Sequence, residues 1–358
     1  MLDRVRVTIS AGGTLGKTCI SSHSHQTTPM TSRITVLGDG GWGTALALVL
    51  NRNGHDVTVW GIDSDYMAEV TSTGQNSRYL PGIDIPETLK WSGDRKEVTE
   101  NTDTFVVAVP SKFYRDTLSS FSGLISSSAS VVTVSKGLLD NQRLSEWATD
   151  LLGLTHVAAL SGPSHAEEVA KQAPTAVTSA STDPELALHF QSLFNATRFR
   201  VYTSSDIIGV ELGGALKNVI AIGAGISDGL GFGDNTKAAL VTRGLAELIR
   251  LGTAWGGQPE TFTGLSGVGD LMVTCGSQHS RNRSFGEKIG QGQTVAEIEA
   301  STQMVAEGVF NAKTALELAE SLNVDVPITR EVYRVLYEGV SPAEAMDTLM
   351  SRDPKPEN

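Results

Sequence analysis

The 358-residue chain has only two cysteines, Cys19 and Cys275, too few for a disulfide framework and typical of proteins from a reducing compartment. Positive charge is scarce as well, because 28 Lys and Arg stand against 40 Asp and Glu, giving a formal net charge of −12. Such a surface repels phosphate backbones, so we expect no nucleic-acid partner, although a local basic pocket can still bind a small anion.

Long uncharged apolar runs are also lacking. The nearest approach, residues 207–226, is interrupted by Glu211 and Lys217 and is rich in glycine, so we predict no membrane span and a cytoplasmic protein. His279 has no second His or Cys at a metal-like spacing, so we predict no metal site.

The first residues differ from the rest of the chain. Residues 1–29 are rich in Ser, Thr, Gly and His and contain no apolar core of the signal-peptide kind. We interpret residues 1–31 either as a disordered extension or as sequence upstream of a translation start at Met30.

Apolar runs rich in Val then alternate with helix-length segments. The runs are nearly continuous in hydrophobicity, as in strands buried on both faces, so we expect a mostly parallel sheet covered by helices. The predicted strands are residues 34–38, 57–61, 104–109, 130–135, 156–162, 175–180 and 199–204. Strand–helix alternation of this kind is typical of a doubly wound, Rossmann-like α/β domain, which we place at residues 32–206.

The strands stop near residue 206, where a long apolar helix pattern begins. Further helix patterns follow to the C-terminal region, and the change is one of periodicity rather than composition. We therefore predict that an all-helical C-terminal domain, residues 207–350, follows the doubly wound sheet.

A glycine cluster follows the first predicted strand. Gly38, Gly40 and Gly43 fit G-x-G-x-x-G, with Gly41 and Trp42 between them, at the start of a predicted helix. In a dinucleotide site these glycines allow a tight turn, close approach of the pyrophosphate and close packing of helix on strand, and the helix N-terminus offers free N–H groups. The alternative is a purely structural turn.

Asp63 lies 20 residues after Gly43, at the end of the second predicted strand. An acidic residue at this spacing usually accepts from the adenosine ribose 2′-hydroxyl and favours NAD. The alternative is a turn residue or helix N-cap. Because Arg52 and Arg78 could supply positive charge, we leave the choice between NAD and NADP open.

Three later strands end in small or polar residues, at positions 109–111, 134–137 and 161–164. Ligands of open α/β sheets bind outside the carboxyl ends of the strands, so these segments, with Lys136 among them, form a candidate site. For Lys136 the alternative is an ordinary solvated loop lysine.

A second lysine, Lys217, lies on the apolar helix pattern. Its side chain should extend back over Gly213 and Gly214, which leave room beneath it. Burial there would lower the pKa of the lysine and suit it to proton transfer. The alternative is that the glycines permit close helix packing and Lys217 reaches out to water.

Two further motifs carry polar groups. Asp270 lies between glycines and apolar residues, and Ser280, Arg281 and Asn282 follow ten residues later. A hydroxyl, a guanidinium and an amide in a row can bind one phosphate, although a plain basic helix start gives the same pattern.

Together these motifs resemble the bacterial type of NAD(P)-dependent sn-glycerol-3-phosphate dehydrogenase. The stretches that carry the resemblance are GDGGWGTALA, VAVPS, VSKGL, SGPSHAEEVA, GVELGGALKNVIAIGAGISDGLGFGDN, TRGLAEL, GLSGVGDLMVTC, SRNRSFG and VAEGV, between about residues 32 and 348. The glycine cluster is general among dinucleotide-binding proteins, whereas ELGGALKNVIAIGAG and SRNR are specific to this family.

The resemblance implies a site between a Rossmann-like and a helical domain, reduction of dihydroxyacetone phosphate for phospholipid synthesis, and a homodimer. It implies that Lys217 is the proton donor, assisted by Lys136 and Asp270. The implied substrate contacts are Lys136, Gly162, Ser164, Lys217, Asn218, Asp270, Ser280, Arg281 and Asn282. The implied NAD(P) contacts, beside the glycines and Asp63, are Trp42, Lys136, Ala166, Arg281, Val305 and Glu307.

Two positions depart from the family pattern. Gly41 stands where the family often has Ser, and Ile62 where it often has His or Arg. The second change removes a plausible contact to a 2′-phosphate, so strict use of NADPH is in doubt. Two other classes stay open: a β-hydroxyacid or ketopantoate-type reductase, against which the Ser280–Asn282 cluster argues, and a non-catalytic nucleotide sensor, which would need no proton donor.

Overall fold

The computed structural model describes residues 31–301, 306–354 and 356–357. The expectations for the N-terminal extension and for a start at Met30 therefore fall outside the described residues, as does the predicted cofactor contact Val305. Residues 31–358 form one compact unit.

The first half of that unit is built on an eight-stranded sheet with strand order β10-β9-β8-β5-β4-β1-β2-β3. Neighbouring strands are parallel except for the pair β8 and β9, which is antiparallel. The strands are β1 (Arg33–Leu37), β2 (Asp56–Trp60), β3 (Lys90–Ser92), β4 (Thr104–Val107), β5 (Ser130–Thr133), β8 (Ala158–Ser161), β9 (Thr175–Ala180) and β10 (Phe199–Ser204). The mostly parallel Rossmann-like sheet predicted from the Val-rich runs is confirmed.

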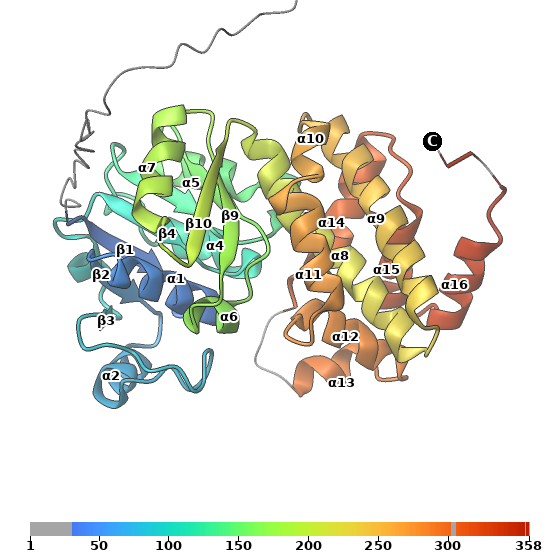
Figure 1. The fold of residues 1–358 in the computed structure, drawn as a ribbon, viewed down its shortest axis with the longest axis horizontal. Coiled ribbons are helices and arrows are strands. Elements are labelled where there is room, and N and C mark those ends of the chain that lie inside the picture. Colours follow the sequence, from blue (N-terminus) through green and yellow to red (C-terminus); the bar gives the residue numbers. More distant parts are fainter. Residues whose placement is uncertain (1–30, 302–305, 355, 358) are drawn as a thin grey trace, which may run out of the picture. The chain divides into compact units, whose positions relative to one another are not determined.

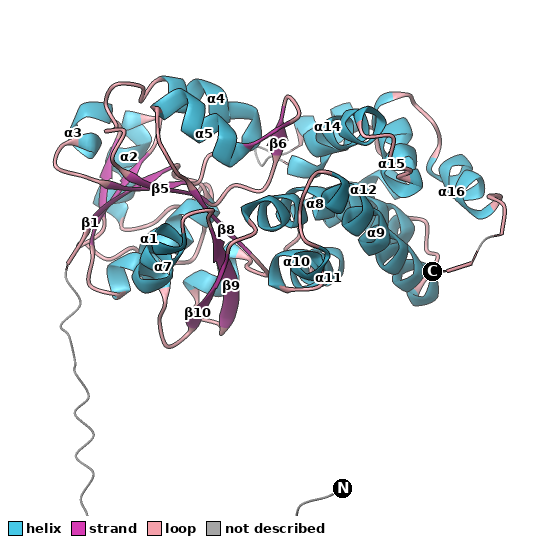
Figure 2. Ribbon diagram, turned by 90° about the horizontal axis from the view of Figure 1, so that it is seen from above, coloured by secondary structure: helices cyan, strands magenta, loops and turns pink. Residues whose placement is uncertain are grey.

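Helices cover both faces of this sheet. Figure 2 shows α1 and α7 on one face and α4 and α5 on the other, and each face has its own buried apolar cluster. The helices of this half are α1 (Gly41–Arg52), α2 (Ser64–Thr73), α3 (Arg95–Thr99), α4 (Ser111–Ser119), α5 (Leu144–Leu152), α6 (Ala166–Ala170) and α7 (Pro184–Phe194). Burial on both faces explains why the central strands lack alternating polarity.

The second half is helical and is organised around α8 (Ile207–Gly229), which packs against α9, α11, α12, α14 and α15 (Figure 1). Its members after α8 are α9 (Asp234–Ala254), α10 (Pro259–Phe262), the π-helix η1 (Leu265–Gly269), α11 (Asp270–Gly276), α12 (Arg281–Gly290), α13 (Val295–Ala300), α14 (Glu307–Ser321), α15 (Pro327–Tyr337) and α16 (Pro342–Met350). Within the described residues, α8 alone is long and apolar enough to cross a membrane, but its apolar window is 94% buried. It is the core helix of this half.

Three short strands were not anticipated. The edge strand β3 has only three residues, and β6 (Leu138–Leu139) and β7 (Gln142–Arg143) form a two-residue antiparallel hairpin. Segments this short carry no periodicity from which a strand can be predicted. The predicted domain boundary at residue 206 lies between the end of the last strand at Ser204 and the start of α8 at Ile207. Because residues 31–358 form one compact unit, the division into two domains stays a prediction.

Candidate active site

The glycine cluster makes the turn from β1 into α1. Gly38 has φ +121°, and a Cβ there would lie 2.7 Å from the Ala108 carbonyl oxygen. A Cβ on Gly43 would collide with the Gly38 carbonyl, whereas one on Gly40 would meet no atom within 4 Å. Two glycines thus permit close packing, and the third leaves open space at the helix start. This is the cradle that a dinucleotide pyrophosphate requires.

The N-terminus of α1 is left open for a ligand. Its N-cap, Gly40, offers no side chain, so the first N–H groups of the helix have no side-chain cap. Trp42 is fixed beside them by donating from Nε1 to the Val134 carbonyl, 3.1 Å away. A Cβ on Gly41 would lie 2.6 Å from the Tyr79 carbonyl oxygen and 3.7 Å from Cβ of Ala166, so a Ser at this position would require the Tyr79 backbone to shift.

Asp63 caps helix α2, as its alternative interpretation predicts. One carboxylate oxygen accepts from the Tyr66 N–H at 3.0 Å and the other from the Arg78 guanidinium at 2.8 Å. The hydrogen bond from Tyr66 and, to a smaller extent, the one from Arg78 hold the pKa of Asp63 below its usual range. Ile62 beside it is 85% exposed. Contact between Asp63 and a ribose stays a prediction.

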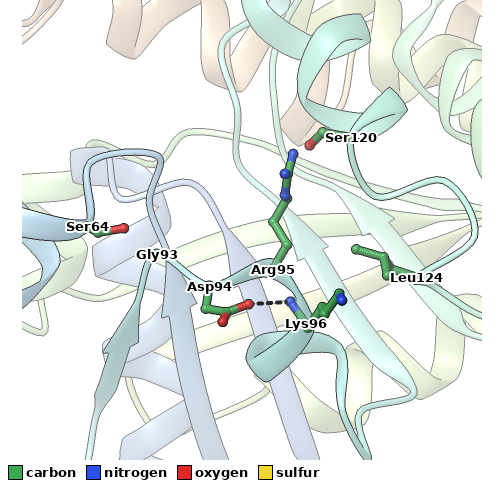
Figure 3. Close-up of a pocket in the computed structure, with 7 residues that line it drawn as sticks. All are labelled: Ser64, Gly93, Asp94, Arg95, Lys96, Ser120 and Leu124. Carbon is green, nitrogen blue, oxygen red and sulfur yellow. Dashed lines mark hydrogen bonds between the residues drawn. The ribbon is translucent and has the colours of Figure 1, made fainter.

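An open pocket of about 540 Å³ borders this end of the sheet (Figure 3). It is lined by Ser64, Gly93, Asp94, Arg95, Lys96, Ser120 and Leu124. The close-up shows Arg95 extending toward Ser120, while the Asp94 carboxylate accepts from the Lys96 N–H at 2.8 Å to cap α3. None of the chemical motifs identified in the sequence lies in this pocket.

Lys217 is buried, with 4% of its surface exposed, so the alternative in which it reaches water is wrong. Its Nζ donates to Asp270 Oδ1 and to Thr274 Oγ1, each at 2.5 Å. Burial lowers the pKa of Lys217 to about 8, against the opposing effect of the Asp270 carboxylate. The lysine is therefore poised near neutrality.

Asp270 is shared between two lysines. Its second oxygen accepts from Lys136 Nζ at 2.8 Å, and Lys136 also donates to the Gly162 carbonyl at 2.9 Å, with Ser164 Oγ at 3.5 Å. Burial works to raise the pKa of Asp270, but the two ammonium groups outweigh it and hold the pKa below its usual range. The ends of β5 and β8 thus meet α8 and α11 at one cluster, whereas Ser111, after β4, bonds to Glu307 instead.

The glycines of α8 bring this cluster together. A Cβ on Gly214 would lie 2.6 Å from Ser161 Oγ and 3.4 Å from Lys136 Cγ, and one on Gly213 would lie 2.5 Å from the Ser266 carbonyl oxygen. The space above the glycines is thus filled by neighbouring segments. The Lys217 side chain does not occupy this space, contrary to the prediction. The close packing at Gly214 instead brings Lys136 next to Asp270, the carboxylate that Lys217 also binds.

Asn218 and Asn282 form a second buried network. Asn282 donates to Asn218 Oδ1 at 2.8 Å and accepts from the Gly308 N–H at 2.9 Å, while Asn218 donates to the Lys136 carbonyl at 3.2 Å. These amides join α8, α12 and α14 to the end of β5. Part of their hydrogen-bonding capacity is therefore used within the protein.

The rest of the predicted phosphate cluster lies at the start of α12. Ser280 is the N-cap, accepting from the Arg283 N–H at 3.2 Å, and Arg281 is exposed. The charge of Arg281 acts on the nearby Glu307 carboxylate. Glu307 itself accepts from both N–H and Oγ of Ser111, and burial raises the pKa of Glu307 despite these bonds.

Sequence reasoning missed Thr274 as a partner of Lys217. It lies four residues after Asp270 on α11, so the helical spacing puts both on one face. It also missed the ion pair between Arg143 and Glu211, 3.0 Å apart, which lie far apart in the chain. Among the described residues no group of three or more His, Cys, Asp or Glu is placed to hold a metal ion.

A Rossmann-type nucleotide cradle joined to a helical half that supplies a buried lysine defines a nicotinamide-dependent dehydrogenase. The chain belongs to the NAD-dependent glycerol-3-phosphate dehydrogenase family. The model of the family's N-terminal part matches residues 33–187, and that of its C-terminal part matches residues 206–347.

Similar proteins agree with this assignment. A glycerol-3-phosphate dehydrogenase (NAD(P)+) of Fusobacterium nucleatum is 48% identical over 329 residues, covering 90% of this chain and 98% of its own. One from Geobacillus kaustophilus is 49% identical over 90% of this chain and 96% of its own. The crystal structure of glycerol-3-phosphate dehydrogenase from Coxiella burnetii matches with a TM-score of 0.88 and 41% identity, over 90% of this chain and all of that one.

Proposed function

We propose that this chain reduces dihydroxyacetone phosphate to sn-glycerol 3-phosphate with NAD(P)H. The observation that carries the proposal is the buried cluster in which one carboxylate, Asp270, lies between Lys136 and Lys217. Two ammonium groups and one carboxylate leave one positive charge in excess. A protein with a net charge of −12 thus keeps a small cationic site, which suits an anionic substrate and a developing oxyanion.

The nicotinamide, when bound, supplies a hydride to C2 of the ketone. Lys217 then protonates the carbonyl oxygen, for which its pKa of about 8 suits it, since it is largely protonated at pH 7 yet a stronger acid than a free lysine. Lys136 adds positive charge near the same oxygen. Asp270 fixes both ammonium groups, and Thr274 fixes Lys217 from the other side.

The remaining predicted residues divide into two sets. We assign Gly162, Ser164, Asn218, Ser280, Arg281 and Asn282 to the phosphorylated substrate, and Gly38, Gly40, Gly41, Trp42, Gly43, Asp63, Lys136, Ala166, Arg281, Val305 and Glu307 to the cofactor. Binding energy from the non-reacting phosphate orients the ketone for hydride transfer. The glycine cradle and the uncapped start of α1 support the cofactor set.

We also propose the setting in which the reaction runs. The scarcity of cysteine and the family membership support a cytoplasmic enzyme that supplies glycerol phosphate for phospholipid synthesis and acts as a homodimer. The pairing of Asp63 with Arg78 and the exposed Ile62 support use of NADH at least as readily as NADPH.

Ketopantoate reductase is the main competing activity on this fold. One such protein, from Ralstonia eutropha, matches with a TM-score of 0.57 at 15% identity, which reflects the fold alone. The relatives at 48–49% identity favour the phosphorylated ketone instead. A nucleotide sensor would need no buried proton donor, so the Lys217 environment argues against that role.

The test is absorbance at 340 nm with purified protein and dihydroxyacetone phosphate, run in parallel with NADH and NADPH. We expect oxidation of at least one cofactor, and almost none when unphosphorylated dihydroxyacetone replaces the substrate at the same concentration. No oxidation with either cofactor would overturn the proposal, and ketopantoate would then be the next substrate to try.

A further inference from the structure

His165 lies inside the candidate site, yet no role is assigned to it. It is the N-cap of α6, between Ser164 and Ala166, but its side chain makes no capping hydrogen bond. The neighbours Ser164 and Ala166 are already assigned to the substrate and to the cofactor. In the chain, His165 therefore lies between a residue proposed for the substrate and one proposed for the cofactor.

The His165 ring nitrogen Nε2 is buried and has no hydrogen-bond partner among the residues that the structure describes. Buried polar atoms in native proteins are nearly always paired, so an atom of this kind calls for an explanation. At the edge of a ligand site, the simplest explanation is that the ligand provides the missing partner.

The surroundings of His165 indicate which part of a ligand would bind to Nε2. Its ring centroid lies 5.9 Å from that of His279, which directly precedes Ser280 and the proposed phosphate cluster. The ring therefore lies beside the segment that would hold a phosphate group. Pro163, on the same loop, lies within 3.7 Å of a Cβ built on Gly269, next to Asp270, so the loop bridges both parts of the site.

Burial, assisted by two nearby lysines, lowers the pKa of the His165 ring and favours its neutral form at pH 7. These lysines are Lys217 and Lys136, whereas Glu168 and Glu167 act to raise the pKa. A neutral imidazole has one N–H donor and one acceptor. When Nε2 carries the proton, it needs an acceptor, which the nearby ammonium groups cannot be; an anion attracted by the same lysines can.

We propose that His165 binds the substrate by donating a hydrogen bond from Nε2 to the phosphate group of the phosphorylated ketone. This inference rests on the proposed function and extends it with a residue to which the family resemblance gave no role, although His165 lies within the SGPSHAEEVA stretch. His165 then helps to distinguish phosphorylated from unphosphorylated ketones, while Lys217 serves the carbonyl.

The experiment compares H165F, which keeps a flat ring without a donor, with H165Q, whose amide nitrogen can replace Nε2. The control is H156Q, because His156 is exposed and precedes β8 whereas His165 follows it. NADH oxidation is measured with dihydroxyacetone phosphate, with high concentrations of dihydroxyacetone, and with inorganic phosphate as a competitive inhibitor.

In H165F we expect KM for dihydroxyacetone phosphate and Ki for inorganic phosphate to rise about tenfold or more, because charge-assisted hydrogen bonds are strong. The kcat and the rate with dihydroxyacetone should change less than threefold. H165Q should recover most of the phosphate affinity, and H156Q should behave as the unmodified protein. Should H165F not fold, H165N takes its place, because its shorter amide does not reach as far.

Unchanged KM and Ki in a folded H165F would overturn the inference, as would equal losses with the phosphorylated and unphosphorylated ketones, which would place His165 at the carbonyl. Failure of the proposed function is distinguishable, since the unmodified protein would then oxidise no NADH with dihydroxyacetone phosphate.

Discussion

Helix α8 carries two buried charges, Glu211 and Lys217, and their surroundings are mirror images. At Glu211 one guanidinium, that of Arg143, lies between two carboxylates, at 3.0 Å from Glu211 and 2.6 Å from Glu146. At Lys217 one carboxylate, that of Asp270, lies between two ammonium groups. Each cluster has one charge in excess.

The clusters differ in where that excess charge lies. In the first, the excess is carried by Glu146, whose side chain is 39% exposed and is solvated by water. In the second, the side chains of Lys136, Lys217 and Asp270 are all at least 84% buried. Because an uncompensated buried charge is costly, the second cluster favours an anion from outside the chain, as the proposed phosphorylated substrate would supply. The first cluster joins two parts of the protein, and the second is the one we propose to bind the substrate and transfer the proton.

The largest effect should follow from Lys217→Ala, which removes the proposed proton donor. We expect kcat to fall by about 10²–10⁴-fold, the usual contribution of a positioned acid, with a much smaller change in KM for dihydroxyacetone phosphate. Steady-state NADH oxidation measures both constants. The control is Lys313→Ala, an exposed lysine on α14. Turnover within about threefold of the unmodified protein would exclude Lys217 as the donor.

Asp270→Asn tests whether the shared carboxylate sets the proton affinity of the lysine. In the proposed mechanism ketone reduction requires protonated Lys217, so its rate should fall as the pH rises through about 8, the pKa of Lys217. The Asp270 charge raises that pKa, so the substitution should lower the midpoint of this decline and reduce kcat/KM by about 100-fold. The pH profile of kcat/KM measures the shift.

The reverse reaction gives the opposite sign. Oxidation of glycerol 3-phosphate needs neutral Lys217, and its rate should rise with pH over the same range. Asp228→Asn is the control, because this carboxylate also lies on α8 but binds Lys237 and Arg283. A midpoint that stays in place in Asp270→Asn would mean that another group titrates.

Substitutions in the first cluster, that of Glu211 and Arg143, should change the stability of the protein and not its turnover. Glu211→Ala leaves the largely buried guanidinium of Arg143 with Glu146 as its one carboxylate partner, and it removes the acceptor of the Ser145 N–H and hydroxyl. We expect the free energy of unfolding to fall by about 3 kcal/mol, as when a buried ion pair loses one partner, and kcat to stay within about tenfold. Denaturant unfolding and NADH oxidation are the two measurements.

Glu146→Ala provides the comparison for Glu211→Ala, because it removes the exposed partner of the same guanidinium, together with the oxygen that accepts from the Arg143 N–H at the start of α5. Its expected cost is about 1–2 kcal/mol, as for an exposed ion pair and a helix cap. A Glu211 variant that keeps its stability but loses turnover as Lys217→Ala does would end the distinction between the two clusters.

The sequence was informative where a pattern is local. Val-rich runs predicted the long strands, and the glycine cluster and the lysine on α8 marked the site, because turn and helix geometry follow from neighbouring residues. The pairing of Arg143 with Glu211 could not be predicted, since it depends on how distant segments pack. Lys136 and Asp270 were singled out separately, but only the fold brings them to one another.

The smallest effect concerns Asp63, whose pair with Arg78 is exposed on both sides. Asp63→Ser keeps an oxygen to cap α2 but removes the negative charge that disfavours a 2′-phosphate and frees the guanidinium of Arg78. We expect the ratio of kcat/KM for NADPH to that for NADH to rise about tenfold, with little change in stability. Parallel assays with the two cofactors measure this ratio.

Asp65→Ser is the control for Asp63→Ser, because Asp65 is an exposed carboxylate two residues away, in the first turn of α2. If both variants leave the cofactor ratio unchanged, Asp63 serves only as a helix cap. If only Asp63→Ser shifts it, one side chain both begins α2 and selects the cofactor. The exposed pair of Asp63 and Arg78 would then influence cofactor binding by its charge, and screening by water would make this effect smaller than that of the buried lysines on the substrate.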